Sequence, residues 1–340
     1  MAQRSHVAHL LHLTFHELIE SILLLATEPC WLVMTINENR QPRKIGFIGL
    51  GDMGKPMATN LLKAGNHLLV YDLKPERISA LVSEGANGAS SITEVVKGSD
   101  VVITMVRTPE DVEVAVLGKE GVADRGREGI LVIDFTTVGP QVSLRIADRL
   151  QKKGIQYIEA AVSGVPIRAQ AGELTIALSG DEKLIQENMD IFQAVGKQIF
   201  LVGPYGNAKK IKIANNTLTA INQMAIYEVS TMLRKAGVDI EMFSKILREC
   251  SGYSKAAERL SIVKSREFDR TGGTGRLSLL HKDLGLSLEL GDGVEAAMPF
   301  AALAHQLSQI SRAAGISEEG STSLVKIFEK LSHLEDNTGT

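Results

Sequence analysis

Short apolar runs alternate with helical segments between Lys44 and Pro204, and then the runs stop. Runs rich in β-branched residues lie at 44–51, 67–72, 100–106, 129–137 and 156–164. Helical patterns such as 55–65 separate them. This alternation is typical of βαβ units around a buried parallel sheet. Two further runs, 174–180 and 198–204, extend the predicted sheet.

The pattern changes to helix alone after Gly206. One long helical pattern covers 208–236, and Gly237 follows it at a position where glycine commonly ends a helix. The remaining chain is helical with short polar breaks such as 271–275. A length of 340 residues suits two domains. The sequence therefore predicts an α/β domain over 44–205 and an all-helical domain over 206–335, joined by the long helix.

The first 43 residues do not share this pattern and are predicted to be an N-terminal extension outside both domains. An apolar segment, 7–26, is interrupted by polar residues, namely His9, His12, His16, Glu17 and Glu20. These side chains argue against a membrane span. We interpret the histidines as a polar stripe on an amphipathic helix, and no metal site is predicted. Met34 is an alternative start of the natural chain.

The composition is that of an ordinary folded protein. Hydrophobic residues make up 44% and charged residues 23%, and the net charge is −3. A chain with this charge has no basic field to attract nucleic acid or an acidic membrane. Its two cysteines, Cys30 and Cys250, form no CxxC motif. A disulfide framework or a zinc cluster is not expected, and a reducing compartment such as the cytoplasm is predicted.

A glycine-rich turn follows the first predicted strand. Gly49, Gly51 and Gly54 have GxGxxG spacing and precede a helical segment. That context is required for binding a dinucleotide, because glycine lets the backbone approach a pyrophosphate at a helix N-terminus. The alternative is a tight strand-to-helix turn that binds no ligand. Dinucleotide binding is favoured because the strand, the turn and the helix are accompanied by an acidic residue at the end of the next strand.

That acid is Asp72, which ends the next strand 18 residues after Gly54. A carboxylate in this position accepts hydrogen bonds from the ribose hydroxyls and repels a 2′-phosphate, which favours NAD over NADP. Two nearby cations, Lys74 and Arg77, work against this preference.

Four more segments follow the glycine turn in order: "DFTTVGP" (134–140), "EAAVSGVPIRAQAGELTI" (159–176), "GNAKKIKIANN" (206–216) and "HKDLGLS" (281–287). From Lys44 to about Leu331 the chain thereby resembles the β-hydroxyacid dehydrogenases, the 3-hydroxyisobutyrate dehydrogenase-like family. The resemblance implies a Rossmann domain, a long interdomain helix and an all-α domain. It also implies NAD(P)-dependent interconversion of a β-hydroxyacid and its semialdehyde, no metal, and a homodimer or homotetramer.

The resemblance also implies roles for single residues. Substrate would be bound by Ser163, Gly164, Asn216 and Thr137. The cofactor would contact Gly49, Leu50, Gly51, Met53, Gly54, Asp72, Met105, Thr137 and Lys282. Thr137 and Lys282 would lie near both the nicotinamide and the substrate.

Oxidation of a hydroxyl group requires a residue that takes its proton. No histidine lies between His67 and His281, so the common base is missing from the central region. A lysine serves if burial or a neighbouring cation lowers its pKa from about 10.4. In the reductive direction a protonated lysine is already the required acid.

Three lysines occur in the segment "KKIK". Lys212 and Asn216 are four residues apart and share a helix face, whereas Lys210 points away. Helical phase does not exclude Lys209. The family match selects Lys212 as the catalytic residue, and we interpret Lys209 and Lys210 as solvated.

Two rival functions remain open at this point. An imine reductase has the same fold, but such enzymes usually lack the catalytic lysine. A non-catalytic dinucleotide-binding protein would not need Lys212, Asn216, Ser163 and Lys282 together. The substrate is open among 3-hydroxyisobutyrate, 3-hydroxypropionate, glycerate with tartronate semialdehyde, and 4-hydroxybutyrate.

Overall fold

The computed structural model of the chain describes residues 41–268 and 275–334. The apolar segment 7–26, with its histidines, and most of the polar break 271–275 lie outside the described residues.

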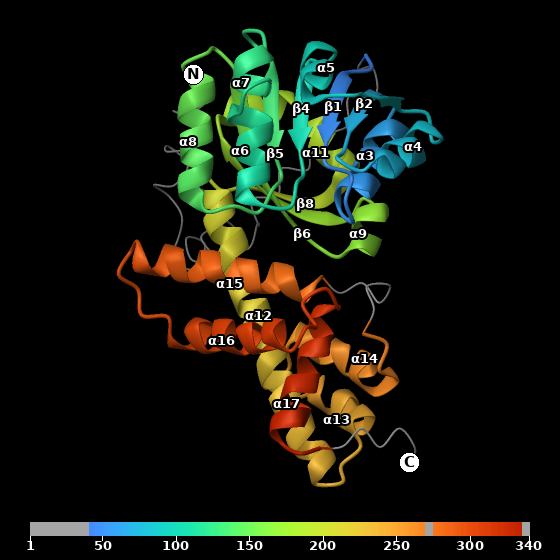
Figure 1. The fold of residues 1–340 in the computed structure, drawn as a ribbon, viewed down its shortest axis with the longest axis vertical. Coiled ribbons are helices and arrows are strands. Elements are labelled where there is room, and N and C mark those ends of the chain that lie inside the picture. Colours follow the sequence, from blue (N-terminus) through green and yellow to red (C-terminus); the bar gives the residue numbers. More distant parts are fainter. Residues whose placement is uncertain (1–40, 269–274, 335–340) are drawn as a thin grey trace, which may run out of the picture. The chain divides into compact units, whose positions relative to one another are not determined.

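An eight-stranded sheet forms the centre of the nucleotide domain, in the order β3-β2-β1-β4-β5-β6-β7-β8 (Figure 1). Its strands are β1 (Lys44–Ile48), β2 (His67–Tyr71), β3 (Asn87–Gly88), β4 (Val101–Thr104), β5 (Leu131–Asp134), β6 (Gln156–Ser163), β7 (Leu174–Gly180) and β8 (Gly196–Leu201). Neighbouring strands are parallel except β6 and β7, which are antiparallel. Only residues 164–173 join β6 to β7, too short a segment for a parallel crossover.

Helices cover both faces of the sheet. They are α3 (Gly54–Lys63), α4 (Pro75–Val82), α5 (Ile92–Lys97), α6 (Pro109–Leu117), α7 (Val122–Arg125), α8 (Pro140–Gln151), α9 (Pro166–Gln170), α10 (Glu182–Glu187) and α11 (Met189–Val195). Successive residues of β4 alternate between two cores: Ile103 packs in one and Val102 in the other. The central strands β1, β4 and β5 are mostly apolar because helices bury both of their faces. The predicted α/β fold is confirmed.

The second domain is helical throughout its described residues and begins with α12 (Asn207–Lys235). The others are α13 (Ile240–Leu247), η2 (Lys255–Arg259), α14 (Leu260–Ser265), α15 (Leu277–Asp292), α16 (Pro299–Ala313), η4 (Ser321–Leu324) and α17 (Val325–Leu331). Gly237 follows α12 with a positive φ of 76°, as its predicted capping role requires. None of the described helices is long and apolar enough to cross a membrane.

The helix α12 belongs to both domains. The helix contacts β6 and β7 of the sheet, and it also packs against α15, α16 and α17. In Figure 1, α12 is yellow and these three helices are orange to red. Met224 and Tyr227 of α12 lie in the core of the helical domain with Leu284 of α15. The residues near the start of α12 are therefore held at the sheet, and those further along are held among the helices.

Candidate active site

The glycine turn between β1 and α3 is as tight as its sequence predicts. Gly49 has a φ of 97°, and its amide donates a hydrogen bond to the carbonyl oxygen of Tyr71 at 2.9 Å. A β-carbon on Gly54 would lie 1.9 Å from the carbonyl oxygen of Gly49. A β-carbon on Gly51 would meet nothing within 4 Å. Gly49 and Gly54 are thus required by the turn, while Gly51 borders open space that a pyrophosphate can approach.

Asp72 follows β2 directly and contacts this turn. Its carboxylate accepts hydrogen bonds from the amides of Leu50, at 2.7 Å, and Lys74, at 2.9 Å. The guanidinium of Arg77 lies 3.3 Å from the same carboxylate. Asp72 is therefore placed beside the turn, with a cation next to it that reduces its local negative charge.

Three other predicted cofactor contacts surround the turn. Leu50 is buried, whereas Met53 and Met105 are partly buried and pack against the core cluster that includes Leu50. The amide of Met105 donates to the carbonyl oxygen of Ile48, so the end of β4 lies beside the end of β1. The turn, Asp72 and these apolar side chains fit the nucleotide predicted for this place.

Lys212 lies in the second turn of α12 and is partly buried. Burial lowers the pKa of Lys212, the positive charge of Lys282 lowers it further, and the negative charge of Asp283 opposes both. Asn216, one turn later, donates a hydrogen bond to the Asp283 carboxylate at 2.5 Å. The structure thus brings Lys212 and Asn216 together with two neighbouring residues of α15.

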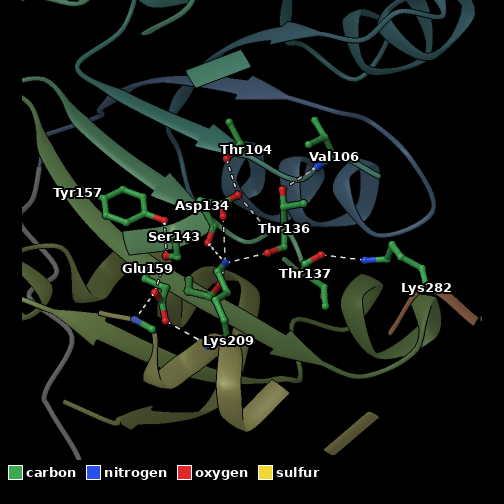
Figure 2. A network of polar contacts seen from close by, with 12 residues as sticks. Thr104, Val106, Asp134, Thr136, Thr137, Ser143, Tyr157, Glu159, Lys209 and Lys282 are labelled. Atoms are coloured by element: carbon green, nitrogen blue, oxygen red, sulfur yellow. Dashed lines mark hydrogen bonds and ion pairs between the residues drawn. The ribbon is translucent and has the colours of Figure 1, made fainter. Parts of the chain in front are cut away.

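Lys282 connects α15 to the loop after β5. Its ammonium donates to the carbonyl oxygen of Thr137 at 2.8 Å (Figure 2). It also lies 3.1 Å from Asp283 Oδ1. That Asp283 oxygen is buried, and Lys282 is its ion-pair partner. Thr137 and Lys282, far apart in sequence, are therefore neighbours. The sequence identified Lys282 but missed Asp283, although the two are adjacent.

Ser163 ends β6 and is partly exposed, and the exposed Gly164 follows it. Gly164 has a φ of 151°, and a β-carbon there would lie 2.6 Å from Leu174 Cδ2. Glycine therefore suits this position, and it leaves the main chain exposed beside a hydroxyl that can donate to an anion.

The prediction that Lys209 is solvated is wrong. Lys209 is 0% exposed, and its ammonium donates to four oxygen atoms of Asp134, Thr136 and Ala160 (Figure 2). Lys210 is exposed, as predicted. A signal for the burial was present in the sequence, since Asp134 and Glu159 stand within apolar strands and buried carboxylates require a cation.

In residues 41–268 and 275–334 no group of three or more His, Cys, Asp or Glu side chains could hold a metal ion. The fold and the glycine turn together are those of a dinucleotide-binding protein with an α/β domain and a helical domain.

Comparisons with known proteins identify the family. Residues 44–203 match the NAD-binding domain of 6-phosphogluconate dehydrogenase, and residues 206–328 match the NAD-binding domain of NADP-dependent 3-hydroxyisobutyrate dehydrogenase. The chain is 34% identical to 2-(hydroxymethyl)glutarate dehydrogenase of Eubacterium barkeri, over 87% of this chain and 98% of that one. It is 33% identical to 3-hydroxyisobutyrate dehydrogenase of Pseudomonas aeruginosa, over 81% and 94%. The crystal structure of 3-hydroxyisobutyrate dehydrogenase from Salmonella typhimurium superposes with a TM-score of 0.76 at 24% identity, over 84% and 99%.

The chain therefore belongs to the β-hydroxyacid dehydrogenase family, which includes the 3-hydroxyisobutyrate dehydrogenases. It is an NAD(P)-dependent oxidoreductase that acts on the hydroxyl group of a hydroxyacid.

Proposed function

We propose that this enzyme interconverts a short β-hydroxyacid and its semialdehyde with NAD(H), and that Lys212 transfers the proton. The observation that carries this proposal is the polar cluster at the junction of α12 and α15. In it, partly buried Lys212 has a lowered pKa and lies near Asp283, which also accepts from Asn216.

Each residue of the site has a separate role in the proposed reaction. NAD(H), when bound, supplies or accepts the hydride. In the reductive direction the Lys212 ammonium donates a proton to the aldehyde oxygen, and in the oxidative direction its neutral amine takes the hydroxyl proton. The Ser163 hydroxyl and the main chain at Gly164 bind the substrate carboxylate. Thr137 and Asn216 orient the reacting end of the substrate, and Lys282 lies beside the nicotinamide.

The substrate is tested with a turnover panel. The hydroxyacids are 3-hydroxyisobutyrate, 3-hydroxypropionate, glycerate, 4-hydroxybutyrate, 2-(hydroxymethyl)glutarate and L-serine, the last two because relatives are named for them. A cyclic imine is included because imine reductases share the fold. We expect turnover of at least one short hydroxyacid and none of the imine. Turnover of the imine alone, or tight NADH binding with no turnover of any compound, would support the rival functions.

NAD(H) is proposed over NADP(H) because Asp72 lies beside the glycine turn with a carboxylate able to bind ribose hydroxyls. We expect kcat/KM to be higher with NADH than with NADPH. Asp72→Ala should reduce this ratio by about tenfold, the effect of losing one hydrogen bond to a charged group. Arg77→Ala is the matched control and should maintain or increase the ratio. A wild-type preference for NADPH would show that Arg77 dominates over Asp72.

Asp283→Asn is expected to shift the pH dependence toward lower pH. The negative charge of Asp283 raises the pKa of Lys212, so its removal lets burial and Lys282 lower that pKa further. Reduction requires protonated Lys212, and kcat/KM for reduction should therefore begin to fall at a lower pH than in the wild type. Oxidation requires the neutral amine and should become active at a lower pH. Movement of either profile toward higher pH would contradict this assignment.

We further propose a division into domains at 205/206, a cytoplasmic location and a homodimeric or homotetrameric assembly. The division is supported by the end of β8 at Leu201 and the start of α12 at Asn207. The free thiol of Cys250 suits a reducing compartment. Exposed apolar side chains on α16, namely Phe300, Leu303 and Ile310, suit contact with a second subunit.

A further inference from the structure

Lys209 of α12 is enclosed by oxygen atoms. Its ammonium donates to Asp134 O at 2.9 Å, Asp134 Oδ2 at 3.0 Å, Thr136 O at 2.8 Å and Ala160 O at 2.8 Å (Figure 2). An ammonium has three N–H groups, so four acceptors occupy it completely. Because its side chain is 0% exposed, Lys209 has no contact with substrate.

These acceptors belong to two neighbouring strands and to the loop that follows the first of them. Asp134 ends β5 and pairs in register with Glu159 of β6, and Ala160 is the next residue of β6. Thr136 lies two residues beyond β5. A single side chain from α12 therefore connects the end of β5 to the middle of β6 and fixes the direction of the loop that leaves β5.

The N-terminus of α12 is held by the same strands. The amides of Gly206 and Lys209 donate to the two oxygens of the buried Glu159 carboxylate, at 2.6 and 3.1 Å. The amide of Ala208 donates to Ser179 Oγ of β7 at 2.9 Å. First-turn amides have no partner within a helix, so the sheet supplies their acceptors. These bonds fix the position of α12 along its own axis and its rotation about that axis, relative to the sheet.

The positions of Lys212 and Lys282 both depend on this arrangement. Lys212 lies three residues after Lys209, nearly one helical turn further along. Lys209 holds the carbonyl of Thr136, and the next carbonyl, that of Thr137, accepts from Lys282. We propose that Lys209 is a positioning residue of the reaction: its buried ammonium sets the place of Lys212 on α12 and of the Thr137 carbonyl that holds Lys282. This inference rests on the proposed role of Lys212.

The alternative is that Lys209 contributes only to stability. A buried ion pair is a weak source of stability, because well-packed apolar residues often replace such a pair without loss. A reaction, by contrast, is sensitive to placement, and a displacement of about 1 Å far from the chemistry can cost about 100-fold in rate. The two explanations therefore differ in their expected effect on the chemical step.

The test is the double variant Asp134→Asn/Lys209→Met, which removes both charges together and keeps similar side-chain sizes. We expect kcat per folded site, counted by NADH titration, to fall about 10- to 100-fold. The affinity for NADH should stay near the wild-type value. With substrate deuterated at the carbinol carbon, the kinetic isotope effect on kcat should rise because hydride transfer becomes slower. Asp134→Asn alone should lose less, since Lys209 keeps its three carbonyl acceptors.

Lys210→Met is the matched control, because Lys210 is exposed, and it should show wild-type kcat and isotope effect. Wild-type kcat per folded site in the double variant would overturn the proposal even if the melting temperature drops. If the double variant does not fold, Lys209→Arg decides: it keeps the charge but changes the reach, so kcat should fall at a near-normal melting temperature. Wild-type kcat and isotope effect in that variant would also overturn the proposal.

Lys212→Ala in the same assay distinguishes failure of the positioning role of Lys209 from failure of the proton-transfer role of Lys212. If Lys212→Ala is impaired and the Lys209 variants are not, only the positioning role fails. If Lys212→Ala has wild-type activity, the proposed function itself is wrong in its choice of proton donor.

Discussion

Lys212→Ala is expected to lower kcat by about 10²–10⁴-fold, the usual contribution of a general acid or base. Lys212 is partly buried with a lowered pKa, and Asn216 on the same helix face donates to Asp283, whose charge acts on Lys212. Alanine at this position removes the transferable proton and leaves α12 intact, because alanine is a strong helix former. The measurement is kcat with saturating cofactor and substrate in both directions.

Two observations must accompany that loss. NADH binding, measured by fluorescence titration, should stay near wild type, since no predicted cofactor contact is removed. Lys210→Ala should leave kcat unchanged, because Lys210 is exposed and its ammonium donates to Asn207, at 3.3 Å. Wild-type kcat in Lys212→Ala would point to another proton donor, and Lys282 would be the next ammonium to test.

Lys209→Met, made alone, is expected to lower the free energy of unfolding by about 3–5 kcal/mol. The substitution leaves the Asp134 carboxylate buried without a cation, although the Thr104 hydroxyl and the Thr136 amide still donate to it at 2.8 and 2.9 Å. It also removes the donor from the carbonyls of Thr136 and Ala160. Urea denaturation with linear extrapolation measures the change.

The added substitution Asp134→Asn should restore much of that stability, because it removes the uncompensated charge. Lys210→Met is the surface control and should change the free energy of unfolding by less than about 0.5 kcal/mol. A loss below about 1 kcal/mol in Lys209→Met would show that water or another cation reaches the Asp134 carboxylate.

Local patterns in the sequence were sufficient for the α/β class of the first domain and the helical class of the second. The apolar runs became strands, the GxGxxG spacing became a turn that requires glycine at Gly49 and Gly54, and the pattern at 208–236 became α12 (Asn207–Lys235). The antiparallel pairing of β6 and β7 was not predicted, because apolar pattern alone does not give strand direction. The short link between these strands was the available clue.

Site residues that belong to a local sequence motif could be predicted. Contacts between segments that are far apart in the sequence could not. The helical period predicted that Lys212 and Asn216 share a helix face. It does not predict which residues of other segments surround Lys209, one turn earlier. The acceptors of Lys209 come from Asp134 and Ala160, 75 and 49 residues earlier in the chain. Asp283 was missed because its partner Asn216 lies 67 residues away, on another helix.

The attachment of the start of α12 to the sheet restricts how the two domains can move relative to each other. A hinge at the domain boundary would have to break the contacts of Glu159 and Lys209 with buried partners, and α12 also carries the packing of α15. Separating the two domains at the start of α12 would therefore require breaking contacts between buried groups. The contact of the partly exposed Lys282 with the carbonyl oxygen of Thr137 can, by comparison, open without leaving a fully buried charge unpaired.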